Sequence, residues 1–224
     1  MKRTLFRILK LVFIILIVIS LANIIIWYRE NMRIKETVDN VSDYLNIDEE
    51  VYEVDEKIKE YNKDIIGWLK VDNTNIDYPI VQGKDNQYYL NHDLYNNKNS
   101  AGWIFMDNRN SLDDQNIIIY GHHRRDGSMF GSIDNLFKNP KTGKILLIIN
   151  GENRYYQIFS AYETEEIETY LDLNYDNFQK TIEKFKNKSK YDYKQNLSDV
   201  EQIITLSTCS NDNKGRIVVH AFKK

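Results

Sequence analysis

A long apolar run near the N-terminus constrains the fold of this 224-residue chain more than any other feature of its sequence. Residues 11–27 read LVFIILIVISLANIIIW, and Ser20 and Asn23 are the only polar residues among them. As a helix this run would measure roughly 26 Å, close to the ~30 Å hydrocarbon core of a bilayer. We therefore expect it to span a membrane.

The residues on either side of the run predict its orientation. The first 28 residues contain no acid, and four basic residues precede the run: Lys2, Arg3, Arg7 and Lys10. Basic flanks favour the cytoplasmic side, whereas Trp27 and Tyr28 suit the opposite interface. The alternative, a cleaved signal peptide, needs a shorter run and a cleavage site of small residues, and the weak candidate at 20–22 lies inside the run. We expect an uncleaved, single-pass anchor with a cytoplasmic N-terminus and an extracellular remainder.

The charge of the chain points away from polyanionic partners. The whole chain has a formal net charge of −3, and the four basic residues at the N-terminus contribute +4, so the other residues carry −7. A mildly acidic body gives no electrostatic reason to bind nucleic acid. Asp107, Asp113 and Asp114 do not have the spacing of a calcium-binding loop, and we expect no metal site.

The rest of the chain changes its pattern near residue 65. Residues 29–64 are charged and place Val51, Val54, Ile58 and Tyr61 at helical spacing. This pattern predicts one or two helices that form a stalk. We therefore divide the chain into a tail and anchor at 1–28, a helical segment at 29–64 and a catalytic domain at 65–224.

The segment from residue 65 onward has the residue pattern of β-strands. Asn150-Gly151 predicts a tight hairpin turn, and runs such as NIIIYG and KILLII are apolar throughout, which predicts burial on both faces. A helix is expected at 176–188. The fold class is thus mostly β, a closed barrel with N-terminal helices and one helix inserted before the last two strands. The candidate strands are 75–81, 102–106, 116–120, 144–149, 154–162, 202–208 and 216–222.

Cys209 is the only cysteine in the sequence. In an exported chain a lone cysteine is inert, joined to another molecule, or reactive. Two strand-like runs flank the polar loop after Cys209, and Arg216 begins the second run. An antiparallel hairpin would set these two residues about 5 Å apart. A guanidinium beside a thiol favours the thiolate and can stabilise an oxyanion, so the pattern predicts a reactive thiol.

A thiol nucleophile needs a proton partner, and the sequence has four histidines. His220 would lie roughly 13 Å along its strand from Arg216, which indicates a structural residue. His92 is expected on the surface or in packing. His122 and His123 follow the apolar run IIIYG where it opens into a polar loop, and extended backbone would point them in opposite directions. Spacing alone leaves either one as the partner.

Five segments of the chain, in this order, resemble class B sortases, the cysteine transpeptidases of Gram-positive bacteria. They read GWLKVDNTNIDYPIVQGKDNQYYLNHD, AGWIFMDNRN, NIIIYGHH, SMFGSIDNLF and TLSTC. The Y-G-H and T-L-S-T-C pieces followed by Arg216 are specific in combination. The resemblance implies a sortase-type barrel with His122, Cys209 and Arg216 as catalytic residues. One departure is His123, which stands where relatives often have Asn.

The resemblance also implies a reaction and its partners. Cys209 would attack a backbone carbonyl, usually of a Thr, in the sorting signal of a surface protein. The resulting thioacyl-enzyme would pass to an amino group of a peptidoglycan precursor or a pilin, and no cofactor is needed. The substrate groove would be lined by Asn86, Leu90, Ser207 and Thr208.

Two other classes of protein remain as alternatives. The first is an L,D-transpeptidase or another cysteine peptidase of the cell wall. L,D-transpeptidases characteristically have Gly before the cysteine and Arg soon after it, whereas here Thr208 precedes Cys209 and Arg216 lies seven positions on. The second is a membrane-tethered binding module without catalysis, which would not need a reactive thiol.

Overall fold

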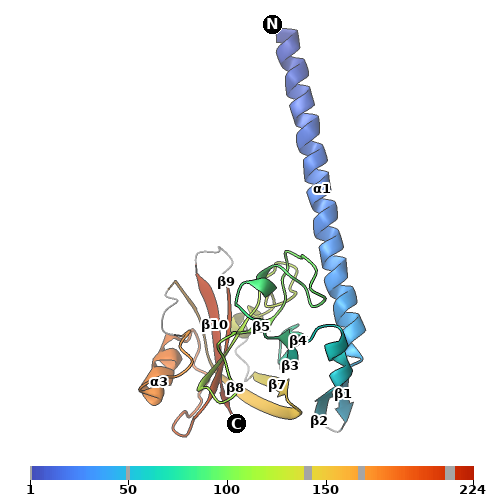
Figure 1. Ribbon diagram of the computed structural model, residues 1–224. Coiled ribbons are helices and arrows are strands. Elements are labelled where there is room, and N and C mark those ends of the chain that lie inside the picture. Colours follow the sequence, from blue (N-terminus) through green and yellow to red (C-terminus); the bar gives the residue numbers. More distant parts are fainter. Residues whose placement is uncertain (1, 49–50, 139–142, 166–169, 210–214) are drawn as a thin grey trace. The chain divides into compact units, whose positions relative to one another are not determined.

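The computed structural model describes residues 2–48, 51–138, 143–165, 170–209 and 215–224. The chain divides into two compact units, Met1–Asn40 and Val41–Lys224. The first unit consists of the helix α1 (Lys2–Ser42), which continues a few residues into the second (Figure 1). The segment Arg3–Ser42 is long and apolar enough to cross a membrane, since an 18-residue window within it has a mean hydropathy of 2.9, and its large apolar side chains from Leu5 to Tyr28 are exposed. By length and composition this helix suggests a membrane anchor.

The expected helix beyond residue 45 in the stalk is wrong, because two short paired strands lie there. The strand β1 (Leu45–Asp48) pairs antiparallel with β2 (Val51–Val54), and the 3-10 helix η1 (Glu56–Glu60) follows. Val and Tyr at 51, 52 and 54 favour extended backbone, and the partner strand supplies the hydrogen bonds. Of the residues whose spacing suggested a helix, Ile58 is buried but Tyr61 is exposed, so they do not form one buried helical face. These elements belong to the same compact unit as the barrel.

The remainder of this unit confirms the predicted closed barrel. Its eight strands are hydrogen-bonded in the order β10-β8-β7-β3-β4-β5-β6-β9, and β9 closes the ring against β10. Neighbouring strands are antiparallel except the pairs β4–β5 and β6–β9, which are parallel. The strands are β3 (Ile65–Val71), β4 (Asp77–Val81), β5 (Phe105–Met106), β6 (Asn116–Tyr120), β7 (Lys144–Ile149), β8 (Glu152–Thr164), β9 (Ile203–Cys209) and β10 (Arg216–Lys223).

Local sequence explains several of these elements. Asn150 and Gly151 have φ angles of 51° and 74° and connect β7 to β8, so the predicted tight turn is confirmed. Both residues adopt positive φ, which the type I′ turn of a hairpin requires. The apolar strands β6 and β7 are buried at nearly every position, as their lack of alternation predicted.

The predicted inserted helix is α3 (Phe178–Lys188), between β8 and β9. Ile182 and Phe185 on its buried face join a hydrophobic cluster with Phe159, Tyr162 and Val218, which come from β8 and β10. This helix and the segment before it therefore cover one side of the barrel (Figure 1). Two shorter helices, η2 (Tyr88–Leu90) and α2 (Asn135–Lys138), lie in the loops after β4 and β6.

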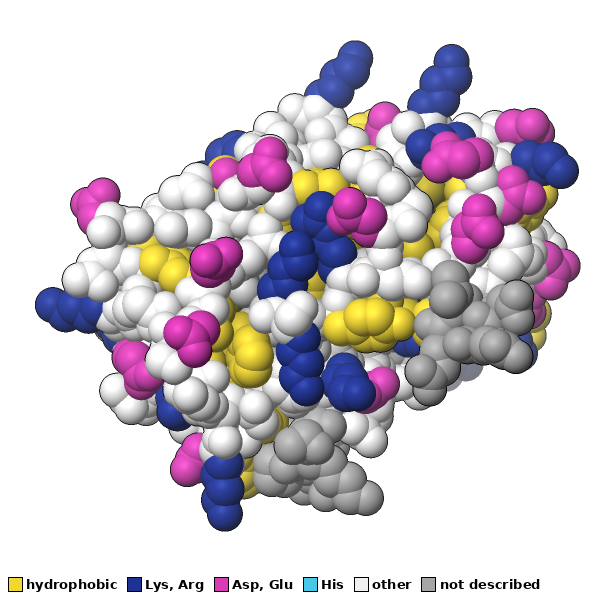
Figure 2. All heavy atoms as spheres, turned by 90° about the horizontal axis from the view of Figure 1, so that it is seen from below, with side chains coloured by type: hydrophobic (Ala, Val, Ile, Leu, Met, Phe, Trp, Pro, Cys, Tyr) yellow, Lys and Arg dark blue, Asp and Glu magenta, His cyan; other side chains and the backbone are white. Residues whose placement is uncertain are grey.

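The surface shown in Figure 2 carries basic and acidic side chains interspersed with one another. Apolar side chains form separate small patches between them. This face of the molecule therefore presents no field of a single sign.

Candidate active site

A cavity of about 330 Å³ collects six of the seven residues that the sequence singled out for catalysis or substrate binding. A larger hollow of about 500 Å³ near β7 and β8 contains none of them. The smaller cavity is called the pocket below. It is lined by Asn86, Gln87, Leu90, Phe105, Tyr120, Gly121, His122, Tyr170, Leu171, Ser207, Thr208 and Arg216.

The hairpin of β9 and β10 sets Cys209 directly opposite Arg216. The two strands are antiparallel, and the next pairs are Thr208 with Ile217 and Ser207 with Val218. Directly opposed residues have Cα atoms about 4.5–5.5 Å apart. The register predicted from the sequence is therefore confirmed at the level of the backbone. The side chain of Cys209 and the loop 210–214 lie outside the described residues.

Arg216 faces the pocket from the start of β10. Its side chain is partly buried, and Nη1 donates to the carbonyl oxygen of Gly215 at 3.3 Å. Because the planar guanidinium carries several donors, it can bind that carbonyl and still stabilise a negative charge in the pocket. The pairing with Cys209 places this charge at the end of the strand that carries the thiol.

His122 enters the pocket from the end of β6, and one of its ring nitrogens is already engaged. Nε2 lies 2.7 Å from the carbonyl oxygen of Leu90. A carbonyl oxygen only accepts, so Nε2 carries the hydrogen and Nδ1 is left to exchange a proton. Gly102 passes close to this ring with φ +58°, and a Cβ there would lie 3.0 Å from His122 Cδ2. The glycine thus allows the neighbouring loop to pack against the histidine.

His123 occupies a different environment, as extended backbone predicted. Its Nε2 lies 3.0 Å from Asp134 Oδ1, and its side chain is 6% exposed. It pairs as an isolated β-bridge with Met129 and does not line the pocket.

The other two histidines have the packing roles that were expected of them. His220 is fully buried, with Nε2 3.0 Å from Tyr162 Oη and Nδ1 2.8 Å from Thr205 Oγ1, and its ring stacks on Phe185. Burial, aided by the charge of Lys188, lowers the pKa of His220 to about 3. His92 stacks on Tyr88.

Six further residues line the pocket that the sequence did not single out as site residues: Gln87, Phe105, Tyr120, Gly121, Tyr170 and Leu171. Tyr120 lies two positions before His122, and its ring packs against Phe105 on the neighbouring strand β5. Tyr170 and Leu171 come from the segment between β8 and α3, and Tyr170 Oη lies 3.3 Å from Ser207 Oγ. Tyr120 and Gly121 had a signal in the sequence, because they belong to the Y-G-H motif, and Gln87 and Phe105 lie in segments that carry the resemblance. Tyr170 and Leu171 lie outside those segments.

Two of the three acids considered for a cation site have protein partners. Asp107 forms an ion pair with Arg109, and Asp114 accepts a hydrogen bond from the backbone of Ser111 at 2.7 Å. Within the described part of the chain, no group of three or more His, Cys, Asp or Glu side chains is arranged to hold a metal ion.

Comparison with known proteins assigns this barrel and its Cys–Arg hairpin to a class. Residues 69–224 match the sortase domain family. The chain is 38% identical to sortase B of Listeria monocytogenes over 188 residues, which are 78% of this chain and 75% of that protein. It is 37% identical to sortase B of Staphylococcus aureus over 177 residues, which are 74% of this chain and 72% of that protein.

Solved structures agree with these sequence relatives. Sortase B of Clostridium perfringens superposes with a TM-score of 0.68 at 35% identity, covering 75% of this chain and 98% of that one. A Bacillus anthracis protein described as similar to sortase B gives a TM-score of 0.72 at 32% identity, covering 88% of this chain and 98% of that one. The chain therefore belongs to the sortase family. Since these relatives are sortases of the B type, the chain is a cysteine transpeptidase. This result argues against the L,D-transpeptidase or cysteine peptidase and against the binding module without catalysis.

Proposed function

We propose that this chain is a membrane-anchored sortase that cleaves the sorting signal of surface proteins and transfers them to an amino group outside the cell. The observation that supports this most directly is the pairing of Arg216 with Cys209 at a pocket that also contains His122. Nucleophile, oxyanion donor and proton carrier are the three parts that acyl transfer by a thiol needs.

The first half of the proposed reaction forms a thioester. The Cys209 thiolate attacks the carbonyl carbon of the scissile peptide bond, and Arg216 donates hydrogen bonds to the oxyanion. His122 takes up the thiol proton of Cys209 on Nδ1 and gives it to the leaving nitrogen as the C–N bond breaks. Since Leu90 holds Nε2, the ring is fixed with Nδ1 available for this transfer.

The second half returns the enzyme to its starting state. An amino group attacks the thioester carbonyl, and His122 accepts the proton that this nitrogen loses. A new amide bond forms, the C–S bond breaks, and Cys209 leaves as thiolate. The same histidine and arginine thus serve both halves.

Peptide binding is assigned to the pocket walls. Asn86 and Leu90 lie on one segment and Ser207 and Thr208 on β9, so an extended peptide between them would reach Cys209. We propose that these four side chains contact the sorting signal on the N-terminal side of the scissile bond.

The location follows from α1 and the charges before it. The basic residues at the N-terminus favour a cytoplasmic tail, so the barrel would face outward. In that position it would meet surface proteins as they emerge and an amine of a peptidoglycan precursor or a pilin.

The test is a transfer assay with the full-length chain in detergent. A library of quenched fluorescent peptides with Thr before the scissile bond is incubated with and without triglycine, which a similar sortase B binds in a crystal structure. We expect cleavage and, with triglycine, a new product joined to it. Cleavage that never yields this product would indicate a peptidase, and no cleavage of any peptide would contradict the proposal.

A further inference from the structure

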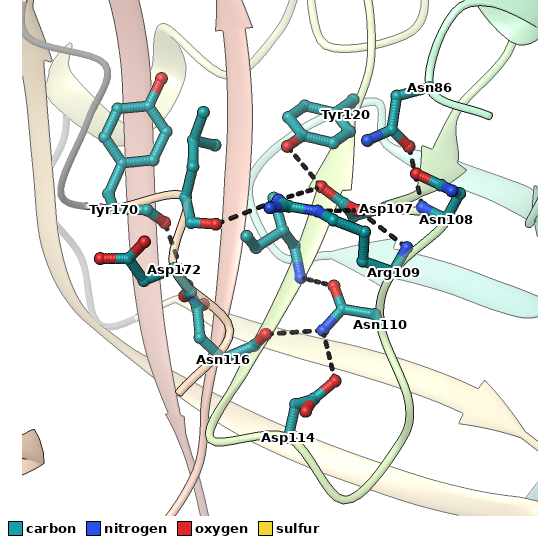
Figure 3. A network of polar contacts seen from close by, with 12 residues as sticks. Asn86, Asp107, Asn108, Arg109, Asn110, Asp114, Asn116, Tyr120, Tyr170 and Asp172 are labelled. Carbon is teal, nitrogen blue, oxygen red and sulfur yellow. Dashed lines mark hydrogen bonds and ion pairs between the residues drawn. The ribbon is translucent and has the colours of Figure 1, made fainter. Parts of the chain in front are cut away.

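An ion pair between a buried carboxylate and a half-exposed guanidinium lies next to the pocket without lining it. Asp107 follows β5, and its side chain is 0% exposed. Arg109 Nε donates to Asp107 Oδ1 at 2.9 Å, and Nη2 donates to Oδ2 at 2.8 Å, which is a bidentate pair (Figure 3). Burial would raise the pKa of Asp107, but the hydrogen bonds from Arg109 outweigh it and lower the pKa to about 2. The carboxylate is therefore a permanent anion at neutral pH.

Two walls of the pocket are hydrogen-bonded to this pair. Tyr120 Oη donates to Asp107 Oδ2 at 2.9 Å. Arg109 Nη2 also donates to the carbonyl oxygen of Leu171 at 3.1 Å. These residues come from the end of β6 and the segment after β8. The pair thus connects parts of the pocket that are far apart in the sequence.

The wall at Leu171 depends on side chains for its position, because the described residues around it form no helix or strand. Asn116 Nδ2 donates to the carbonyl oxygens of Tyr170 at 3.0 Å and Asp172 at 2.9 Å. Together with Arg109, it holds three consecutive carbonyl groups (Figure 3). The Arg109 guanidinium makes the middle one of these three contacts. Because Arg109 is paired with Asp107, this is the one contact of the three that connects the segment to Tyr120.

We propose that Asp107 and Arg109 are positioning residues that hold the Tyr120 and Leu171 walls at the separation that fits the substrate peptide. This inference rests on the proposed function of the pocket. A planar guanidinium that binds two carboxylate oxygens fixes geometry better than a single charge. The pair should act on peptide binding more than on chemistry, since His122 is held separately by Leu90.

The decisive variant is Arg109→Lys, with Arg154→Lys as its matched control. Lysine keeps the charge but cannot bind both carboxylate oxygens and the carbonyl of Leu171 at once. Arg154 has a parallel arrangement away from the pocket: it pairs with Glu152 two residues earlier at 2.9 Å, and Nη1 donates to the carbonyl oxygen of Leu112 at 3.2 Å. Both substitutions remove a guanidinium that pairs with an acid and binds a backbone carbonyl, but only the guanidinium of Arg109 contacts a pocket wall.

Peptide-cleavage kinetics with the full-length chain should separate the two. For Arg109→Lys we expect KM for the best library peptide to rise at least about tenfold while kcat stays within about threefold. Arg154→Lys should leave both values unchanged. An unchanged KM in Arg109→Lys, or an equal rise in Arg154→Lys, would overturn the proposal.

Two further measurements cover the remaining outcomes. If Arg109→Lys does not fold, Tyr120→Phe is the second variant, because it removes only the hydrogen bond from Tyr120 to Asp107. We expect its KM to rise about threefold or more. An unchanged KM in Tyr120→Phe would count against the proposal. If the wild-type chain cleaves no peptide, the proposed function fails by itself. Hydrogen exchange then decides the positioning role: backbone amides at 170–172 should exchange faster in Arg109→Lys than in Arg154→Lys, and equal rates would refute it.

Discussion

His122 and His123 are adjacent residues with different surroundings, and their variants should behave differently. His122 lines the pocket with Nδ1 available, whereas His123 is bound to Asp134 outside it. We predict that His122→Ala is nearly inactive in peptide cleavage and that His123→Ala keeps substantial activity. A steady-state assay of both variants checks this, and the reverse ranking would move the proton carrier to His123.

Arg216 should matter through its shape as well as its charge. Loss of one oxyanion donor costs on the order of 10²–10³ in rate, or about 3–4 kcal/mol, so Arg216→Ala should lose at least about that much in kcat/KM. Arg216→Lys should recover only part of it, because lysine lacks the planar fork.

The competing role for Arg216 is to stabilise the start of β10. In that case Arg216→Ala would retain cleavage but show a lower melting temperature. Measuring both quantities on the same preparations distinguishes the two roles, and full activity with reduced stability would remove Arg216 from the site.

Single residues differ in how far the sequence could identify them. The placement of Arg216 opposite Cys209 could be predicted because the two are joined by a short hairpin. Arg109 could not be connected to the pocket, since its contact with Leu171 joins residues 62 positions apart. Such a contact depends on the closed barrel and leaves no local pattern.

Among the elements, the junction of β8, β9, β10 and α3 contains a buried histidine whose titration should be visible in stability. The pKa of His220 is about 3 in the folded chain and ordinarily 6.5. Below pH 6.5 the unfolded chain binds a proton that the folded chain does not. This group therefore lowers the free energy of unfolding as pH falls from 6.5 towards 3, by up to about 1.4 kcal/mol per pH unit.

The measurement is urea unfolding between pH 6.5 and 5, where carboxylates contribute least. Wild type should lose stability over this interval faster than His220→Gln, which keeps a polar side chain but does not titrate. Parallel slopes for the two proteins would show that His220 is not held neutral by the fold.

Local pattern was sufficient for some elements and misleading for others. The strands β6 and β7 match their predicted limits because unbroken apolar runs bounded by polar residues define both ends. The pairing of β1 and β2 was mistaken for a helix, since Val51, Val54 and Ile58 also have helical spacing. The strand β3 was not singled out among the candidates, although the texture from residue 65 onward was read as strand-like.

For the whole molecule, the apolar helix should determine location and not chemistry. Deleting residues 1–28 removes the apolar part of α1 and leaves the compact unit Val41–Lys224 intact. We predict a soluble protein that cleaves the same peptides with unchanged kcat/KM, whereas the full-length chain sediments with membranes. A truncated chain that is folded by circular dichroism but processes none of these peptides would give the helix a catalytic role.

The most direct test of catalysis by Cys209 is the mass of the enzyme during turnover. The full-length chain is mixed with a cleavable peptide in the absence of an added amine, quenched in acid within seconds and analysed by intact-protein and peptide mass spectrometry. We predict an added mass equal to the N-terminal half of the peptide, located on Cys209, lost on addition of triglycine and absent in Cys209→Ala. Cleavage by Cys209→Ala at the wild-type rate, or an acyl group on another residue, would contradict the assignment.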